Sequence, residues 1–262
     1  MNSRDRHQHI LAEVHQKRHV SARDLAAAIG VSEATVRRDL RTLADAGQIE
    51  LVYGGATLRR SSDYSFRSKS TRNVEAKRVI GRLAADLVHD QEQVFLDSGT
   101  TTFEMAAFLK RRHGISVIVN SARLALELDV PDLRVILLGG QYRADRMDCI
   151  GPLAMSMLDQ LRGYTCFIGA DGLSMDFGPA ASDIESAALF HRAVQNARET
   201  ILVADHSKFD SPSLFKIVEW NDVSRVVTDK QPGDAWIEFL ESRGVQVVCP
   251  PAAAPVATQN AG

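Results

Sequence analysis

Short apolar runs alternate with amphipathic helical patterns between residues 74 and 249. The alternation predicts strands at 94–96, 115–119, 133–138, 164–168, 200–204, 223–228 and 245–248. Helical patterns separate most of them, at 74–89, 102–112, 121–128, 152–161, 184–197 and 234–242. Strands that are apolar throughout, with helices in between, are typical of a mainly parallel sheet covered on both faces. We therefore expect residues 74–249 to form an α/β domain.

The first 58 residues follow a different pattern, with three helices and a short hairpin. The helices are predicted at 4–18, 22–29 and 33–46, and the hairpin strands at 49–52 and 56–58. Ser21 and Ser32 are residue types that commonly begin helices, and Gly30 commonly ends one. The second and third helices each carry an apolar face, and the turn between them is short and contains glycine. This combination predicts a helix–turn–helix over residues 1–58.

The third helix has a basic outward surface. With Val36 and Leu40 turned inward, arginines face outward, and arginine pairs with guanine edges or neutralises phosphates. The side chains expected to face DNA from this helix and its start are Ser32, Thr35, Arg37, Arg38 and Arg41. An ordinary helical hairpin with a solvated basic face is the alternative. The caps, the turn and the arginine pair occur together, which favours DNA binding.

The distribution of charge agrees with this division. Residues 1–60 carry ten Lys and Arg against seven Asp and Glu, whereas the remainder carries 21 against 26. A mildly basic head on an acidic body suggests nucleic-acid contact at one end. The first residues lack the apolar core of a signal peptide, and no run of 18 apolar residues occurs. We expect a cytoplasmic protein that does not associate with membranes.

Cysteine and histidine usage predicts no metal and no cofactor. Cys149, Cys166 and Cys249 are far apart and lie in apolar surroundings, which indicates reduced, buried thiols. The histidines show no metal-binding spacing.

Two further stretches lack apolar periodicity: the polar residues 59–73 are expected to be a linker, and residues 250–262 a disordered tail.

Short motifs along the whole chain resemble those of a known family. VSARDLAAAIGVSEATVRRDLRTLADAG, followed by GGA at 54–56, is similar to the winged helix–turn–helix of the DeoR family of bacterial transcriptional regulators. FLDSGTTT, VNSARLA, VILLGG, IGP, FIGADG and ADHSKF follow in the family's order, so the resemblance covers residues 4 to about 248. It implies a repressor, occasionally an activator, of sugar or polyol catabolism genes. It also implies a C-terminal domain that senses a phosphorylated metabolite and is similar to ribose-5-phosphate isomerase.

The predicted hairpin departs from the family at its tip. The family usually carries a His before GGA and an Arg a few residues earlier, whereas this chain has Tyr53 and Glu50-Leu51 there. We include Tyr53 among the residues expected to face DNA. One winged head reads only a few base pairs, so a homo-oligomer, dimer or tetramer, is expected on double-stranded operator DNA.

Four predicted strands end in small, polar or acidic residues, which indicates one shared crevice. The segment DSGTTT after the first strand offers hydroxyl and N–H groups to an anion, although helix capping alone would also explain it. In the light of the resemblance, the hydroxyls hold a phosphate, Lys208 balances its charge and Asp171 accepts from sugar hydroxyls. The expected effector-binding residues are Asp97, Ser98, Gly99, Thr100, Thr101, Thr102, Asn120, Gly140, Asp171 and Lys208.

An isomerase-like enzyme with an accessory DNA-binding head is the alternative function. The isomerases that the second domain resembles need a glutamate base and a lysine in the loop after their GAD segment, to support the developing charge. Glu185 could be the base, but no Lys or Arg occurs between Asp171 and His191. We therefore expect binding of a phosphorylated sugar or polyol without turnover, and no enzyme activity.

Overall fold

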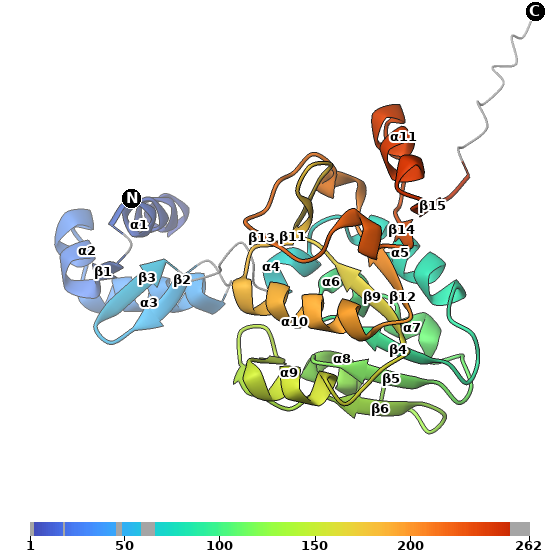
Figure 1. The fold of residues 1–262 in the computed structure, drawn as a ribbon. Coiled ribbons are helices and arrows are strands. Elements are labelled where there is room, and N and C mark those ends of the chain that lie inside the picture. The colour runs from blue at the N-terminus through green and yellow to red at the C-terminus, as the bar shows by residue number, and fades with distance from the viewer. Residues whose placement is uncertain (1–2, 18, 46–48, 59–65, 252–262) are drawn as a thin grey trace, which may run out of the picture. The chain divides into compact units, whose positions relative to one another are not determined.

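The computed structural model describes residues 3–17, 19–45, 49–58 and 66–251 (Figure 1). It divides into two compact units, Met1–Asp63 and Tyr64–Gly262, and each has a hydrophobic core of its own. Residues 59–65 of the expected linker and 252–262 of the expected tail lie outside the described residues. Among the helices that are described, none is both long enough and apolar enough to cross a membrane.

The first unit combines three helices with a three-stranded antiparallel sheet in the order β1-β3-β2. The elements are α1 (Ser3–Lys17), β1 (His19–Ser21), α2 (Ala22–Ile29), α3 (Glu33–Asp45), β2 (Ile49–Val52) and β3 (Gly55–Leu58). The hydroxyl of Ser21 begins α2 by accepting from the backbone N–H of Asp24 at 3.0 Å, and Gly30 ends it at a φ of 75°. The predicted helix–turn–helix is confirmed. Strand β1 was not predicted, because three residues are too few to show an alternation.

The second unit is built on a seven-stranded parallel sheet in the order β15-β14-β12-β9-β4-β5-β6. Its strands are β4 (Gln93–Leu96), β5 (Ser116–Val119), β6 (Arg134–Leu137), β9 (Thr165–Gly169), β12 (Glu199–Val203), β14 (Arg225–Val227) and β15 (Gln246–Val248). Each corresponds to one of the seven predicted strands, so the α/β fold with a mainly parallel sheet is confirmed. The order of the strands did not follow from the sequence pattern.

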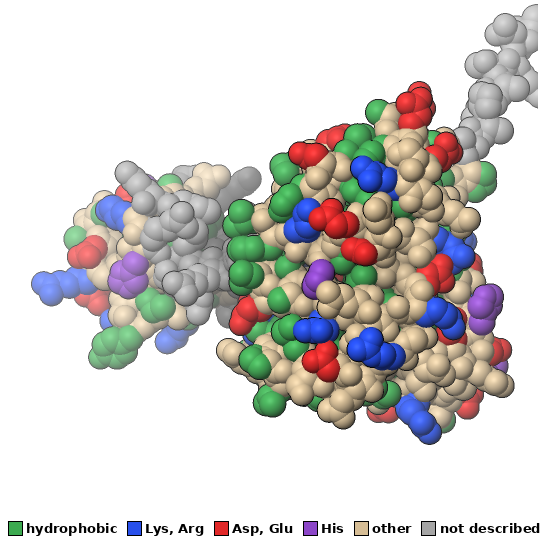
Figure 2. Space-filling model, viewed as in Figure 1, with side chains coloured by type: hydrophobic (Ala, Val, Ile, Leu, Met, Phe, Trp, Pro, Cys, Tyr) green, Lys and Arg blue, Asp and Glu red, His purple; other side chains and the backbone are tan. Residues whose placement is uncertain are grey.

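Helices cover both faces of this sheet, which explains why its strands are apolar throughout. One core lies between the sheet and α5 (Val74–Asp86), α7 (Ala106–Leu109) and α8 (Ala122–Glu127). The other lies between the sheet and α9 (Pro152–Leu158), α10 (Ile184–Asn196) and α11 (Asp234–Ser242). On the visible face of this unit, basic and acidic side chains are interspersed, and hydrophobic ones gather at one edge (Figure 2).

The helix predicted at 102–112 is two short helices, α6 (Thr100–Phe103) and α7. Between them, the N–H groups of Glu104 and Met105 donate to carbonyls only three residues earlier, at 3.2 and 3.0 Å. Such tightened turns interrupt an α-helix without disturbing its apolar spacing, so the sequence pattern does not reveal them.

Two small antiparallel sheets fold over the carboxyl side of the parallel one and were not predicted. The first pairs β7 (Gln141–Arg143) with β8 (Asp148–Ile150), and the second joins β10 (Gly172–Ser174), β11 (Gly178–Ala181) and β13 (Phe215–Lys216). Short helical turns, η1 (His206–Lys208) and η2 (Trp220–Asp222), lie in the loops that follow. These strands have only two to four residues each, which is too few to show an alternation.

Part of the expected linker 59–73 is a helix of the second unit, α4 (Phe66–Ser70). The ring of Phe66 packs edge-on against Phe103 of α6, with 5.4 Å between ring centroids, and the Arg123 guanidinium lies 4.3 Å above it. The polar sequence around Phe66 hid this helix, because its packing depends on one aromatic side chain rather than on an apolar stripe. The second unit therefore begins before residue 74.

Candidate functional site

The order of the strands reverses at β4, whose neighbours are β5 on one side and β9 on the other. In a doubly wound sheet, ligands bind beyond the carboxyl ends of the strands at this point, where the connections diverge and leave a crevice. The segment 97–102 follows β4, and residues 170 and 171 follow β9. The fold therefore brings together two segments that the sequence analysis assigned to one site.

Asp97 joins these two segments. Its carboxylate is 2% exposed and accepts from the backbone N–H groups of Gly99 at 2.9 Å and Gly169 at 2.7 Å, and from the Thr102 hydroxyl. Burial raises the pKa of Asp97, and the three hydrogen bonds oppose that rise. Because its oxygens face the protein's own donors, Asp97 holds the loop in shape, together with the fully buried Thr102.

The other residues of the loop remain at least partly accessible. Ser98 and Gly99 are half-buried, and Thr100 and Thr101 are 8% and 9% exposed. The Ser98 hydroxyl donates to Asp148 at 3.0 Å, which ties the loop to the hairpin of β7 and β8. The loop thus presents a rigid set of hydroxyl and N–H groups at the switch point of the sheet.

Three lysines from three different elements converge on this region; we call Lys69, Lys77 and Lys208 the lysine cluster. Lys69 of α4 forms an ion pair with Asp171. Lys77 of α5 is buried, and its ammonium group donates to the backbone carbonyls of Lys69 and of Arg72, the latter at 2.6 Å. Burial lowers the pKa of Lys77, and the charges of Lys208 and Lys69 lower it further.

Sequence reasoning found only Lys208 of these three. Lys69 was hidden in the expected linker, where nothing in the pattern points to a ligand. Lys77 did leave a signal: it precedes the fully buried Ile80 and Ala84 by three and seven residues, so it lies on the buried face of its helix. A lysine on such a face is rare unless it has partners.

Asp171 is held by Ser182 as well as by Lys69. Its carboxylate accepts from the backbone N–H of Ser182 at 2.9 Å and from the Ser182 hydroxyl at 2.5 Å. Burial alone would raise the pKa of Asp171, but Lys69 and Ser182 hold it below its ordinary value. Asp171 is therefore a carboxylate, paired with a cation that comes from α4.

The turn between α4 and α5 is hydrogen-bonded to the segment 205–208, which carries Lys208. Asn73, at a φ of 50°, donates to the Asp205 carboxylate at 2.9 Å and to the Ser207 hydroxyl at 3.1 Å. Beyond Lys208, the indole of Trp236 donates to Asp210 at 2.9 Å. The residues around Lys208 are thus hydrogen-bonded both to the turn after α4, through Asn73, and to α11, through Trp236.

Asn120 and Gly140 lie at the ends of the neighbouring strands. The Asn120 side chain is fully buried and donates to the carbonyl of Cys149 at 3.2 Å, while its Oδ1 has no hydrogen-bond partner in the described part of the chain. Gly140 has a φ of 150°, and a Cβ there would lie 2.5 Å from the carbonyl oxygen of Ile150. Close packing accounts for Gly140, and its contact with a ligand stays a prediction.

A second charged network surrounds Glu185, the expected base of the alternative enzyme. Arg143 forks around Asp148 with two 2.8 Å hydrogen bonds and also donates to Asp183 at 2.6 Å. Burial raises the pKa of Asp183, but Arg143 and its other partners bring it down to about 2. The half-exposed Glu185 lies 3.9 Å from Arg143. The loop after Asp171 has no Lys or Arg of its own, but Arg143 of the hairpin β7–β8 places a cation near Glu185.

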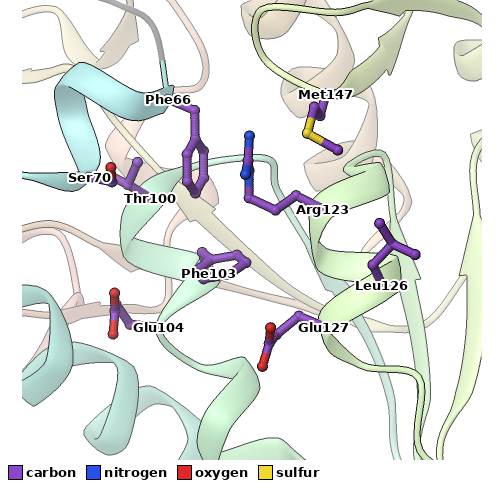
Figure 3. A pocket seen from close by; sticks show the side chains of 9 residues that line it. All are labelled: Phe66, Ser70, Thr100, Phe103, Glu104, Arg123, Leu126, Glu127 and Met147. Atoms are coloured by element: carbon purple, nitrogen blue, oxygen red, sulfur yellow. The ribbon is translucent and has the colours of Figure 1, made fainter. Parts of the chain in front are cut away.

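A pocket of about 470 Å³ opens beside the loop (Figure 3). It lies between α4, α6 and α8, with the Arg123 guanidinium beside the ring of Phe66. Its lining residues are Phe66, Ser70, Thr100, Phe103, Glu104, Arg123, Leu126, Glu127 and Met147. Within the described residues, no three His, Cys, Asp or Glu side chains are arranged to hold a metal ion.

In the first unit, α3 presents the predicted basic surface. Val36 and Leu40 are buried, and the arginines at 37, 38 and 41 are exposed. The Ser32 hydroxyl accepts from the N–H of Thr35 at 3.2 Å and lies 2.9 Å from its hydroxyl, so both mark the start of this helix. Tyr53 is fully exposed at the tip between β2 and β3.

A buried ion pair fixes α3 to α1. Asp39 of α3 is 5% exposed and accepts from the Arg6 guanidinium at 2.5 and 3.0 Å, and His7 lies 3.0 Å from it. The hydrogen bond from Arg6 is the main reason that the pKa of Asp39 lies below its ordinary value. This pair orients α3, and sequence analysis missed it because the two residues are 33 positions apart.

The first unit is a winged helix–turn–helix, which is a DNA-binding fold. The second is a doubly wound α/β unit with polar loops and lysines at its switch point, which is an arrangement typical of ligand-binding units. Residues 6–62 match the DeoR-like helix-turn-helix domain, and residues 72–230 match the DeoR C terminal sensor domain. The chain belongs to the DeoR family of transcriptional regulators, as its motifs predicted.

Several relatives are similar over nearly their whole length. The HTH-type transcriptional regulator GlpR of Haloferax volcanii is 34% identical, over 87% of this chain and 90% of its own. The HTH-type transcriptional repressor GlcR of Bacillus subtilis is 32% identical, over 91% and 93%. The glycerol-3-phosphate regulon repressor of Escherichia coli is 29% identical, over 94% and 99%. Ribose 5-phosphate isomerase A of Methanocaldococcus jannaschii, a solved structure, is 17% identical, with a TM-score of 0.40 over 52% of this chain and 55% of that one.

Proposed function

We propose that this chain is a transcriptional repressor of sugar or polyol catabolism genes and that a phosphorylated sugar or polyol releases it from its operator. The names of its relatives support this class, since they include a glycerol-3-phosphate regulon repressor. The observation that carries the proposal is the lysine cluster beside the loop 97–102 at the switch point of the sheet. A loop of hydroxyls and N–H groups flanked by cations suits a phosphate.

In this proposal, the residues have different tasks. Ser98, Gly99, Thr100 and Thr101 bind the phosphate oxygens, and Lys208 and Lys69 neutralise their charge. Asp97 and Thr102 keep the loop in shape, and Lys77 fixes the end of α4 by donating to the carbonyls of Lys69 and Arg72. Asp171 and Asn120, whose Oδ1 lacks a partner in the described residues, accept from hydroxyls of the sugar or polyol.

The signal starts at α4. A bound phosphate competes with Asp171 for Lys69, so it shifts the helix that follows the DNA-binding unit in the chain. Phe66 couples the same helix to α6, which begins within the phosphate loop. Binding releases DNA only if the effector prefers one arrangement, and operator and effector then alter each other's affinity by the same factor.

On DNA, α3 enters the major groove of double-stranded operator DNA in this proposal. Arg37, Arg38 and Thr35 reach base edges, and Ser32 and Arg41 contact phosphates, with Tyr53 adding a contact from the hairpin. Two or four copies of the chain bind together, since one head recognises few base pairs. The protein acts in the cytoplasm, where operator and effector are found.

The proposal does not include turnover. Glu185 is half exposed near Arg143, and Lys69 is engaged with Asp171, so neither is arranged as a free base or electrophile. A purified sample should not isomerise pentose or hexose phosphates. Turnover that disappears in a Glu185→Gln variant would favour the enzyme instead.

The test is a titration of candidate effectors against the protein–operator complex, each in phosphorylated and unphosphorylated form. The wild type should release DNA only with a phosphorylated form, and Lys208→Ala should bind the operator normally but resist release. Lys110→Ala is the control, because Lys110 pairs with Glu127 outside the lysine cluster. Release by the unphosphorylated form at equal or lower concentration, unchanged in Lys208→Ala, would refute the phosphate site.

Effector binding can be followed without DNA. Trp236 is bonded to Asp210, two residues beyond Lys208, so its fluorescence should change when the effector binds. A thermal-shift screen of sugar and polyol phosphates would select the compounds for this measurement.

A further inference from the structure

An apolar groove runs along the outward side of α10. Its volume is about 530 Å³, and it lies between that helix and the segment 214–219. Two large apolar side chains of its lining are exposed: Ile184 at 60% and Leu214 at 73%. Figure 2 shows hydrophobic side chains gathered where α10 begins and beside β13. Contiguous exposed apolar surface of this kind is typical of a protein–protein interface.

The helix itself is suited to contact with another helix. Ile184, Ala188 and Arg192 are four residues apart, so they form one row along the outward side of α10. Ala188 is exposed at the middle of this row, and its small side chain allows a second helix to approach closely. The row therefore has an apolar end, a small centre and a basic end.

The charges along α10 are complementary to those of an antiparallel copy. Glu185, half exposed and 3.9 Å from Arg143, lies in the first turn, and Arg192, 3.4 Å from Asp159 on the same chain, lies near the end. The rim of the groove likewise carries both signs, with Lys216 paired to Glu219 at 2.6 Å and with Asp222. A two-fold axis at Ala188 would place the acidic start of one helix against the basic end of the other. The helix dipoles would also be antiparallel.

We propose that this side of α10, with Leu214, is an isologous interface between two copies of this chain, with the two-fold axis at Ala188. In it, Ile184 fills the groove of the partner subunit, and Glu185 faces Arg192 of the partner subunit. The inference rests on the homo-oligomeric state proposed above, but not on the identity of the effector.

The position of the axis can be tested with one cysteine. In full-length Ala188→Cys, the two new thiols lie close enough across the axis to form a disulfide, so mild oxidation should give a covalent dimer on a non-reducing gel. Leu126→Cys, at a position 72% exposed on α8, is the matched control and should stay monomeric on the gel. The wild type, with Cys149, Cys166 and Cys249, sets the background. Equal crosslinking of both variants, or none in Ala188→Cys, would overturn the proposed axis.

The interface can be tested independently by sedimentation. Ile184→Glu combined with Leu214→Glu should halve the mass of the particle at micromolar concentration, whereas Leu126→Glu should leave it unchanged. Both substituted side chains are exposed, and the fluorescence of the buried Trp220 and Trp236 would verify that the unit is folded. An unchanged mass in the double variant refutes this interface and leaves the oligomer intact. A monomeric wild type refutes the oligomer itself, and effector binding would remain a separate question.

Discussion

Replacing Gly99 with alanine tests whether the hydrogen bonds of Asp97 hold the phosphate loop. A Cβ at this position would lie 2.9 Å from Oδ1 of Asp97 and 3.3 Å from both its Oδ2 and the Thr102 hydroxyl, whereas ordinary contacts are 3.4–4 Å. The carboxylate cannot retreat freely, because Gly169 holds it at 2.7 Å. Either the carboxylate or the loop must move by about 0.5 Å, a distance at which buried hydrogen bonds are lost.

The size of the effect follows from the bonds at risk. Hydrogen bonds to a charged group contribute about 1.5–3 kcal/mol each. Losing one, or straining two, should lower the free energy of unfolding of the second unit by about 2–4 kcal/mol. The hydroxyls of residues 98, 100 and 101 move with the loop, so effector-driven release should weaken as well.

Urea unfolding followed by tryptophan fluorescence is the suitable assay. The chain has two tryptophans, Trp220 and Trp236, and both lie in the second unit, so the DNA-binding unit does not contribute. Gly233→Ala is the matched control, because Gly233 has a φ of −62° and nothing lies within 4 Å of a Cβ there. It should cost under about 1 kcal/mol. If Gly99→Ala were no less stable than this control and released DNA normally, the loop would not depend on Asp97.

Three predictions concern the DNA-binding unit. Arg38→Ala should weaken operator binding by about 1–3 kcal/mol and relax the sequence preference at one base pair. Arg41→Ala should weaken binding to specific and nonspecific DNA alike and make the affinity less dependent on salt. Titrations over a range of salt concentrations measure both effects. Tyr53→Ala should lower operator affinity without changing the salt slope, because an uncharged side chain releases no counterions; a flatter slope would contradict this. The pKa of Asp39 is lower in the folded protein than in the unfolded chain. The ion pair with Arg6 therefore stabilises the unit fully at pH values above the unfolded pKa, and this stabilisation is lost as the pH falls through the folded pKa. Hydrogen exchange of α1 and α3 should show this acid-induced loosening in the wild type and not in Asp39→Asn.

The sequence predicted the seven strands of the sheet because each is a continuous apolar run, and such runs need no partner to be visible. It also predicted the loop 97–102 and Asp171, since their polar residues directly follow strands. The order of the strands could not be predicted, because pairing between β4 and β9 joins segments about 70 residues apart. Without that order, the hydrogen bonds that join Asp97 to both Gly99 and Gly169 could not be predicted either.

The lysine cluster shows what a linear pattern leaves out. Lys208 lies in a recognisable motif, but Lys69 acquires its role only when α4 packs on Phe103. Arg143 was missed for the same reason: it lies in a hairpin whose strands have three residues each. These cations come from elements that are distant in sequence, and their positions depend on tertiary packing alone.

In the homo-oligomer proposed above, helix α4 would also restrict where the DNA-binding heads can bind along DNA. If residues 59–73 were all tether, the chain could reach about 50 Å when fully extended, whereas the stretch 59–65 that precedes α4 can reach at most about 25 Å. Half-sites on one face of the double helix are about 34–36 Å apart, or a multiple of that distance. In such an oligomer, two tethers of at most about 25 Å each would change the distance between the heads by at most about 50 Å, so the distance between the α4 helices would limit how far apart the half-sites can lie. Half-sites that lie farther apart than this could be bound together only if the DNA bends.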